Sequence, residues 1–243
     1  MPAQQETGLD AVNAALVSIQ DEVRVDFGWD LKSDQQSAIA LQQSCTDIDA
    51  VKCATERLIS TLQEAEEIAI LGAAVEADDL LLLDDKCQFV AADGSVGVFD
   101  ELPPPLAQSA WSRLALVVSD GDGGDAMQRA SHQNIPFALH AHGDNQQEWQ
   151  ELLPVLKQNC PTLILTHQCP QPIEGMYNPG GFTDGDRAAC IVAACGIPNN
   201  KIRLIGFRSD KIGRWTGVTD PVRKLRKLKW MDAVLDILRG TSF

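Results

Sequence analysis

The chain has 243 residues, of which 44% are hydrophobic, so it is long and apolar enough to bury a sizeable core. Its formal net charge of −14 at pH 7 argues against binding to nucleic acid or to anionic lipid. No apolar run reaches the roughly 18 residues that a membrane span needs, and no signal peptide is evident, so we expect a cytoplasmic protein with no membrane partner.

Residues 1–64 are predicted to form a helical segment that precedes an α/β catalytic domain at 65–243. Apolar residues at helical spacing predict helices in "AVNAALVSIQDEV" and "DIDAVKCATERLISTLQEAEE". Between these two stretches, Ser33 or Asp34 is the expected start of a further helix.

From about residue 66 onward, short apolar runs alternate with helical stretches. Six strands are predicted, at 67–73, 87–93, 113–120, 136–144, 162–168 and 202–207. Most of these runs are nearly continuous, which is typical of a parallel sheet that is covered on both faces. The sequence therefore predicts a three-layer α/β/α Rossmann-like domain with a mostly parallel sheet, preceded by N-terminal helices and closed by a C-terminal helix in "DPVRKLRKLKWMDAVLDILRG".

Polar residues follow most of the predicted strands, where open α/β sheets bind their ligands. In chain order they are Asp93 and Gly94, then Asp120 and Asp122, then His140, His142, Asp144 and Asn145, then Thr166 and His167, and finally Arg208, Lys211 and Arg214. The carboxylates of Asp120 and Asp122 repel each other and gain little unless a cation joins them. Oxygen ligands of this kind suit Mg²⁺, so the sequence predicts a magnesium site.

The stretch "GGFTDGDRAAC" combines a helix start with acidic residues. Thr183 and Asp186 have the spacing of a capping box, which satisfies free backbone N–H groups at a helix start. That leaves Asp184 free to face a ligand, close to the N–H groups of the same helix. Gly181 permits a close approach of the backbone to a ligand, and Arg187 is a weaker candidate for ligand contact.

Two histidines near the end of the fourth strand allow a different interpretation. His140 and His142 share a strand face with Asp144, and such a set could bind zinc in a metal-dependent hydrolase. The further ligands of a zinc site are not evident in the sequence. His140 lies inside an apolar run and is predicted to be a hydrogen-bonded core residue, whereas His142 and Asp144 are predicted to be functional. His167 is left without a role.

A cluster of aspartates at one sheet edge becomes a platform for phosphate once Mg²⁺ is bound, because the cation neutralises charge on the phosphate oxygens. The remaining anionic oxygens would be held by basic groups, for which the candidates are Arg187, Arg208, Lys211 and Arg214. Neither a P-loop motif nor a G-x-G-x-x-G after the first strand is present.

The ordered set "AADGS", "VVSDGDG", "HAHGDN" and "GGFTDGDRA" resembles the archaeal-type 6-hydroxymethyl-7,8-dihydropterin pyrophosphokinases, which are distantly similar to thiamine pyrophosphokinases. The resemblance covers most of the chain, from "FGWDLKSDQQSA" to the lysine-rich last helix. Two departures stand out. "LGAAVEADD" replaces a Gly-Pro-Ser type turn after the first strand, and "SDGDG" stands where "TDLDG" is usual, which preserves both carboxylates.

The resemblance implies an enzyme of folate- or methanopterin-type pterin biosynthesis that moves the β,γ-diphosphate of ATP to the hydroxymethyl group of a reduced pterin and releases AMP. It implies Mg²⁺ or nucleotide roles for Asp93, Asp120, Asp122, Asp144, Thr183 and Asp184. The expected partners are small molecules, ATP and the pterin alcohol, and a homo-oligomer is left open. The alternatives are a thiamine pyrophosphokinase, a hydrolase that uses His140, His142 and Asp144, and a non-catalytic nucleotide-binding module.

These observations assign two sets of site residues. The catalytic and metal-binding set is Asp120, Asp122, Asp144 and Asp184. The set expected to contact nucleotide or pterin is Asp93, Gly94, His142, Asn145, Gly181, Thr183, Arg187, Arg208, Lys211 and Arg214.

Overall fold

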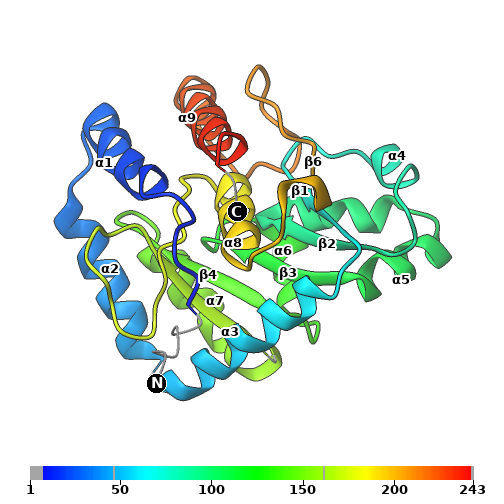
Figure 1. Cartoon of the computed structure of the whole chain (residues 1–243), viewed down its shortest axis with the longest axis horizontal. Coiled ribbons are helices and arrows are strands. Elements are labelled where there is room, and N and C mark those ends of the chain that lie inside the picture. Colours follow the sequence, from blue (N-terminus) through cyan, green and yellow to red (C-terminus); the bar gives the residue numbers. More distant parts are fainter. Residues whose placement is uncertain (1–7, 46, 161, 242–243) are drawn as a thin grey trace.

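A parallel sheet of six strands runs through the computed structural model, which describes residues 8–45, 47–160 and 162–241 (Figure 1). The strands are β1 (Glu67–Leu71), β2 (Cys87–Ala92), β3 (Leu114–Ser119), β4 (Phe137–Ala141), β5 (Leu163–His167) and β6 (Ile202–Ile205). Their order in the sheet is β5-β4-β3-β2-β1-β6, and every neighbouring pair is parallel. All six predicted strands are confirmed.

Helices cover both faces of this sheet, so the three-layer prediction is confirmed (Figure 1). The α-helices are α1 (Ala15–Phe27), α2 (Leu31–Ser44), α3 (Ile48–Gln63), α4 (Ala77–Leu80), α5 (Pro104–Ser112), α6 (Gly124–Ser131), α7 (Gln146–Asn159), α8 (Asp184–Ala194) and α9 (Pro221–Arg239), with short 3₁₀ helices η1 (Asp93–Glu101) and η2 (Asn199–Lys201). Within the described residues, every helix is too short or too polar to cross a bilayer.

Alternation along the strands divides the core between the two faces. In β1, Ala69 and Leu71 pack with residues of α2, α5, α6 and α7, whereas Ile68 and Ile70 pack with residues of α1, α3, α8 and α9. Because both faces are buried, each strand reads as a continuous apolar run. The N-terminal helices thus contribute to both layers. The domain boundary proposed at residue 64 stays a prediction. The first seven residues of the proposed N-terminal segment lie outside the described part of the chain.

The fourth strand is shorter than the sequence predicts, because it ends at Ala141 rather than at residue 144. Side chains take over the backbone N–H groups just beyond it. The Oδ1 atom of Asn145 accepts from the His142 N–H at 2.9 Å, and Oδ1 of Asp34 accepts from the Gly143 N–H at 2.8 Å. These bonds replace the pairing with β5, which ends at Ala141 and His167.

The start of α2 also differs from the prediction. The helix is capped by Asp30, whose side chain accepts from the Lys32 N–H, rather than by Ser33 or Asp34. Asp34 lies in the first turn and is buried. Its Oδ2 atom accepts from Arg24 Nη1 at 3.1 Å and from Gln168 Nε2 at 2.9 Å. Together with its bond to Gly143, this carboxylate links α1, α2 and the loops that follow β4 and β5.

Asp34→Ala is expected to destabilise the fold by about 3 kcal/mol, because it leaves the Arg24 guanidinium buried without one of its two carboxylate partners. Denaturation by urea, monitored by circular dichroism, measures this. Asp49→Ala is the matched control, because Asp49 is exposed in the first turn of α3 and should cost less than about 1 kcal/mol. Equal losses in the two variants would contradict a linking role for Asp34.

Candidate active site

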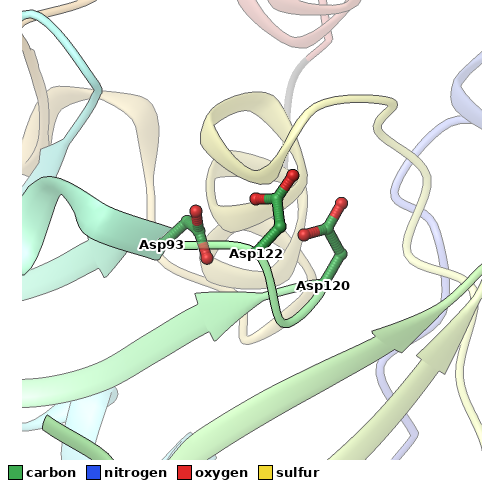
Figure 2. A group of neighbouring side chains, drawn as sticks. All are labelled: Asp93, Asp120 and Asp122. Atoms are coloured by element: carbon green, nitrogen blue, oxygen red, sulfur yellow. The ribbon is translucent and has the colours of Figure 1, made fainter. Parts of the chain in front are cut away.

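Three carboxylates gather just beyond the ends of β2 and β3. One oxygen from each of Asp93, Asp120 and Asp122 lies within 4.8 Å of the others, and Figure 2 shows the three side chains next to one another. Asp93 is the first residue of η1, directly after β2, and Asp120 follows directly after β3. Neighbouring parallel strands thus bring to one point two aspartates that are far apart in the sequence, as the polar residues at the strand ends predict.

Backbone conformation explains the glycines in "DGDGG". Gly121 has φ +105°, so the chain reverses between Asp120 and Asp122 in a conformation that other residues rarely adopt. A Cβ on Gly123 would lie 2.5 Å from Oδ1 of Asp93, so only glycine leaves room for this carboxylate. Asp93 itself has φ +51°, which costs about 1–2 kcal/mol in a non-glycine residue. The position of the Asp93 carboxylate in the cluster is therefore linked to a strained backbone conformation.

A fourth carboxylate approaches the cluster from the N-terminus of α8. Asp184 faces the same pocket, and its Oδ1 atom is buried without a hydrogen-bond partner among the described residues. Burial, and then the charge of Asp120, raise the pKa of Asp184 to about 7. Burial, followed by the charges of Asp184 and Asp120, likewise holds the pKa of Asp93 well above its usual range. The charge of Asp184 therefore disfavours ionisation of Asp93.

These observations fit a divalent cation. Oδ1 of Asp120, like that of Asp184, is buried and has no hydrogen-bond partner in the described structure. Carboxylate oxygens are the ligands that Mg²⁺ prefers, and a cation among them would offset the repulsion that raises the pKa values of Asp93, Asp122 and Asp184. Asp93, Asp120 and Asp122 are the residues best placed to hold it, with Asp184 beside them. The resemblance implied an Mg²⁺ or a nucleotide role for Asp93, and its position in the trio favours the first of these.

The "HAHGDN" motif contributes through an imidazole. His142 lies between two carboxylates, with Nε2 at 3.0 Å from Asp120 Oδ2 and Nδ1 at 2.6 Å from Asp144 Oδ1. Burial alone would lower the pKa of His142, but the hydrogen bonds to Asp120 and Asp144 outweigh it and raise the pKa to about 9. Asp144 thus lies beyond the imidazolium, where it also pairs with Arg223 at 3.6 Å. Its metal-binding role stays a prediction.

Asn145 and two buried histidines lie at the strand ends beside the carboxylates and support them. The Asn145 side-chain amide donates to the carbonyl oxygens of Asp120 at 2.7 Å and of His140 at 2.8 Å, so it fixes two strand ends. His140 is fully buried with Nδ1 at 3.0 Å from Thr166 Oγ1, which confirms the prediction of a hydrogen-bonded core residue. His167 is buried as well, and burial lowers its pKa to about 4.

The capping box predicted at the start of α8 is confirmed. Asp186 is fully buried and accepts from the Thr183 N–H at 2.8 Å and from the Phe182 N–H at 2.6 Å. Arg187 is buried too, and it donates through Nη2 to the Phe182 carbonyl at 2.9 Å. Its charge favours the ionised forms of Asp120 and Asp184. A Cβ on Gly181 would lie 2.5 Å from Arg187 Cα, so this glycine serves packing against α8.

A pocket opens above the carboxylates at the carboxyl edge of the sheet. Seven of the predicted site residues line this pocket: Asp93, Asp120, Asp122, His142, Thr183, Asp184 and Arg208. The other predicted site residues are not among the described residues that line it, and they are Gly94, Asp144, Asn145, Gly181, Arg187, Lys211 and Arg214. Arg208 pairs with Asp210, and Arg214 pairs with Glu76 and Glu101. The ligand contacts expected of these basic residues remain predictions.

Sequence reasoning missed the wall that faces these carboxylates. Lys224 and Lys227 of α9 line the pocket, together with Trp29 from the loop between α1 and α2 and with Phe182. The basic run "RKLRKLK" marks this wall in the sequence, but it predicted only a C-terminal helix. Its position over the pocket depends on β6 pairing with β1, and helical periodicity carries no information about that pairing.

The fold and this site define an α/β protein with an acidic, metal-compatible pocket at the carboxyl edge of a parallel sheet. No family model matches the chain. Curated archaeal proteins named 6-hydroxymethyl-7,8-dihydropterin pyrophosphokinase are similar to it along most of its length. That of Methanothermobacter thermautotrophicus is 28% identical over 236 residues (88% of this chain and 89% of the relative).

Two further relatives of the same name agree. The protein of Pyrococcus furiosus is 28% identical over 228 residues, covering 89% of this chain and 90% of the relative. The protein of Methanocaldococcus jannaschii is 25% identical over 238 residues, covering 90% and 92%. The resemblance that the four motifs indicate is therefore confirmed, and it extends over about nine-tenths of the chain.

Asp122→Asn is expected to raise the melting temperature of the metal-free protein at pH 8. The charge of Asp120, and then burial, raise the pKa of Asp122 from 3.8 to about 6, so its ionised form opposes folding. The loss of stability caused by ionised Asp122 is absent below pH 4, grows as the pH rises toward 6, and reaches its full size above pH 6. The gain in melting temperature should follow the same course.

Thermal melts in a chelator between pH 4 and 8 measure this effect, with Asp125→Asn, an exposed residue in the first turn of α6, as the control. Added Mg²⁺ should stabilise the wild-type protein more than Asp122→Asn, because a cation that binds only the folded state shifts the equilibrium toward it. A melting temperature that Asp122→Asn leaves unchanged at pH 8 in the chelator would contradict the repulsion between the two carboxylates.

Asp186→Ala and Asp184→Ala should separate the two roles inside "FTDGD". The first removes a buried cap and should lower the free energy of unfolding by about 2 kcal/mol, at the upper end of the usual cost. The second removes a carboxylate with an unpaired oxygen and should leave stability unchanged or higher. Urea denaturation of both variants decides between them, and an early transition in Asp184→Ala alone would reverse the assignment.

Proposed function

We propose that this protein is a 6-hydroxymethyl-7,8-dihydropterin diphosphokinase, which transfers the β,γ-diphosphate of ATP to the hydroxymethyl group of the pterin and releases AMP. The observation that carries the proposal is the trio of Asp93, Asp120 and Asp122 within 4.8 Å of one another, at the edge where α/β sheets bind nucleotides. The shared name of the three archaeal relatives supports the choice of substrate.

The proposed reaction is a single displacement at phosphorus. The hydroxyl oxygen of the pterin forms a bond to the β-phosphorus of ATP, and the bond from that phosphorus to the oxygen bridging to the α-phosphate breaks. The electron pair of the broken bond stays with AMP, and the hydroxyl proton is released. Catalysis of such a transfer rests mainly on positioning and on charge stabilisation.

Asp93, Asp120 and Asp122 are the residues that would hold Mg²⁺, which supplies positive charge against the phosphate oxygens when it is bound. The His142 imidazolium holds the Asp120 carboxylate in place through its 3.0 Å contact. The first turn of α8 borders the same pocket, and its free N–H groups favour a phosphate oxygen there. Asp184, in this turn, lies beside the reacting phosphates.

The alternatives differ in what this site must do. A thiamine pyrophosphokinase would use the same donor and the same carboxylates, so only the acceptor alcohol distinguishes it. A zinc hydrolase needs a neutral imidazole at His142, whereas the flanking carboxylates favour the protonated form. Among the described residues, His140, His142 and Asp144 also do not form a group whose ligand atoms converge on one point.

Incubation of the protein with ATP, Mg²⁺ and 6-hydroxymethyl-7,8-dihydropterin should yield AMP and the pterin diphosphate in equal amounts, measured by chromatography. Asp120→Asn should lower kcat/KM by roughly 10²-fold or more, equivalent to about 2.7 kcal/mol of transition-state stabilisation. Asp125→Asn, whose exposed side chain lies outside the trio, should stay within a few-fold of the wild type.

Thiamine in place of the pterin is the parallel assay. AMP that forms only with thiamine would move the assignment to the alternative acceptor. Binding of ATP without AMP formation from any acceptor would favour a non-catalytic nucleotide-binding module, and zinc-dependent hydrolysis without ATP would exclude both kinases.

A further inference from the structure

The basic residues at the start of α9 fall into two groups. The arginines are engaged with acidic side chains, because Arg223 pairs with Asp144 and Arg226 pairs with Asp26. Lys224 and Lys227 both line the pocket. Neither ammonium group has a carboxylate within the 4.0 Å of an ion pair in the described part of the chain. Two cations therefore border the pocket without an anionic partner from the protein.

Aromatic rings hold the Lys227 ammonium in place. Its Nζ atom lies 5.2 Å from the centre of the Trp29 ring and 5.8 Å from that of Phe182. Trp29 is in turn stacked on Phe27 at 4.7 Å. Burial lowers the pKa of Lys227, because the ammonium group loses hydration in the pocket wall. An anion in the pocket would restore the missing interaction.

Lys224 lies on the same helix and lines the same pocket. Its charge acts on Asp122 and Asp184, whereas that of Lys227 acts on Asp144 and Asp120. Because Lys224 and Lys227 are three residues apart, both project from one side of α9. The pocket thus has carboxylates on the strand ends and ammonium groups on α9, with no direct pair between the two sets.

We propose that Lys224 and Lys227 bind the β- and γ-phosphates of ATP, the diphosphate that is transferred. The proposal rests on the proposed function for the identity of the ligand. Lysine suits this task, because a compact ammonium on a flexible stem can follow phosphate oxygens as they move. The transferred diphosphate is common to ATP and to the product, so contacts from α9 can persist through the reaction. The AMP portion is then held elsewhere in the pocket.

Titration calorimetry with magnesium pyrophosphate tests this assignment without turnover. Lys224→Met and Lys227→Met keep the aliphatic stem and remove the charge, and each should weaken binding by roughly tenfold or more, the usual effect of a lost hydrogen bond to a charged group. Lys229→Met is the matched control, because Lys229 is exposed on the same helix and lies outside the pocket walls. Its affinity should stay within twofold of the wild type, and Lys224→Arg should recover most of the lost affinity.

Equal affinities in Lys224→Met, Lys227→Met and Lys229→Met would overturn the assignment, as would a wild-type protein that does not bind magnesium pyrophosphate. Melting curves of each variant confirm that the fold is retained. The two proposals fail in different ways. A protein that binds pyrophosphate through these lysines but forms no AMP with the pterin refutes the proposed function alone. Normal pterin-dependent turnover in both methionine variants refutes the lysine assignment alone.

Discussion

Repulsion among four carboxylates is the constraint around which this structure is built. With one oxygen of each of Asp93, Asp120 and Asp122 within 4.8 Å, each ionised pair opposes folding, and most strongly where the carboxylates are buried. Asp184 adds to this repulsion from α8. The protein offsets only part of the cost, through the His142 imidazolium beside Asp120 and the buried charge of Arg187. The remaining repulsion is what a bound cation would lower.

The buried parallel sheet holds these charged side chains close together despite their repulsion. Asp93 and Asp120 directly follow β2 and β3, whose own residues are almost completely buried. Their backbone positions are therefore fixed by the core, and the carboxylates cannot move apart to relieve their repulsion. The Asn145 side chain adds to this rigidity, because its amide donates to the carbonyl oxygens of Asp120 and His140 at the ends of adjacent strands.

The parts of this architecture that the sequence predicts are those encoded locally. Buried parallel strands are continuous apolar runs, and the capping box at Thr183 and Asp186 needs only a spacing of three residues. What depends on distant partners was not predictable. One example is the pairing of Arg214 with Glu76, at the N-cap of α4, and with Glu101, at the end of η1. The place of Lys227 over Trp29 likewise depends on how α9 packs against α1.

The two walls of the pocket differ in how firmly they are held. The carboxylates directly follow buried strands, whereas the first turns of α9 contact α1 through partly exposed groups, such as Arg226 with Asp26. Exposed ion pairs of this kind contribute little to stability. The Trp230 indole adds a hydrogen bond to Asp26 at 2.8 Å, and Leu228 and Met231 of α9 are buried against the core. We therefore expect local opening to be easiest in the N-terminal turns of α9, ahead of Leu228, where Lys224 lies. A polyphosphate held by the proposed lysine contacts would bridge the two walls and would thereby couple ligand binding to the docking of this end of α9.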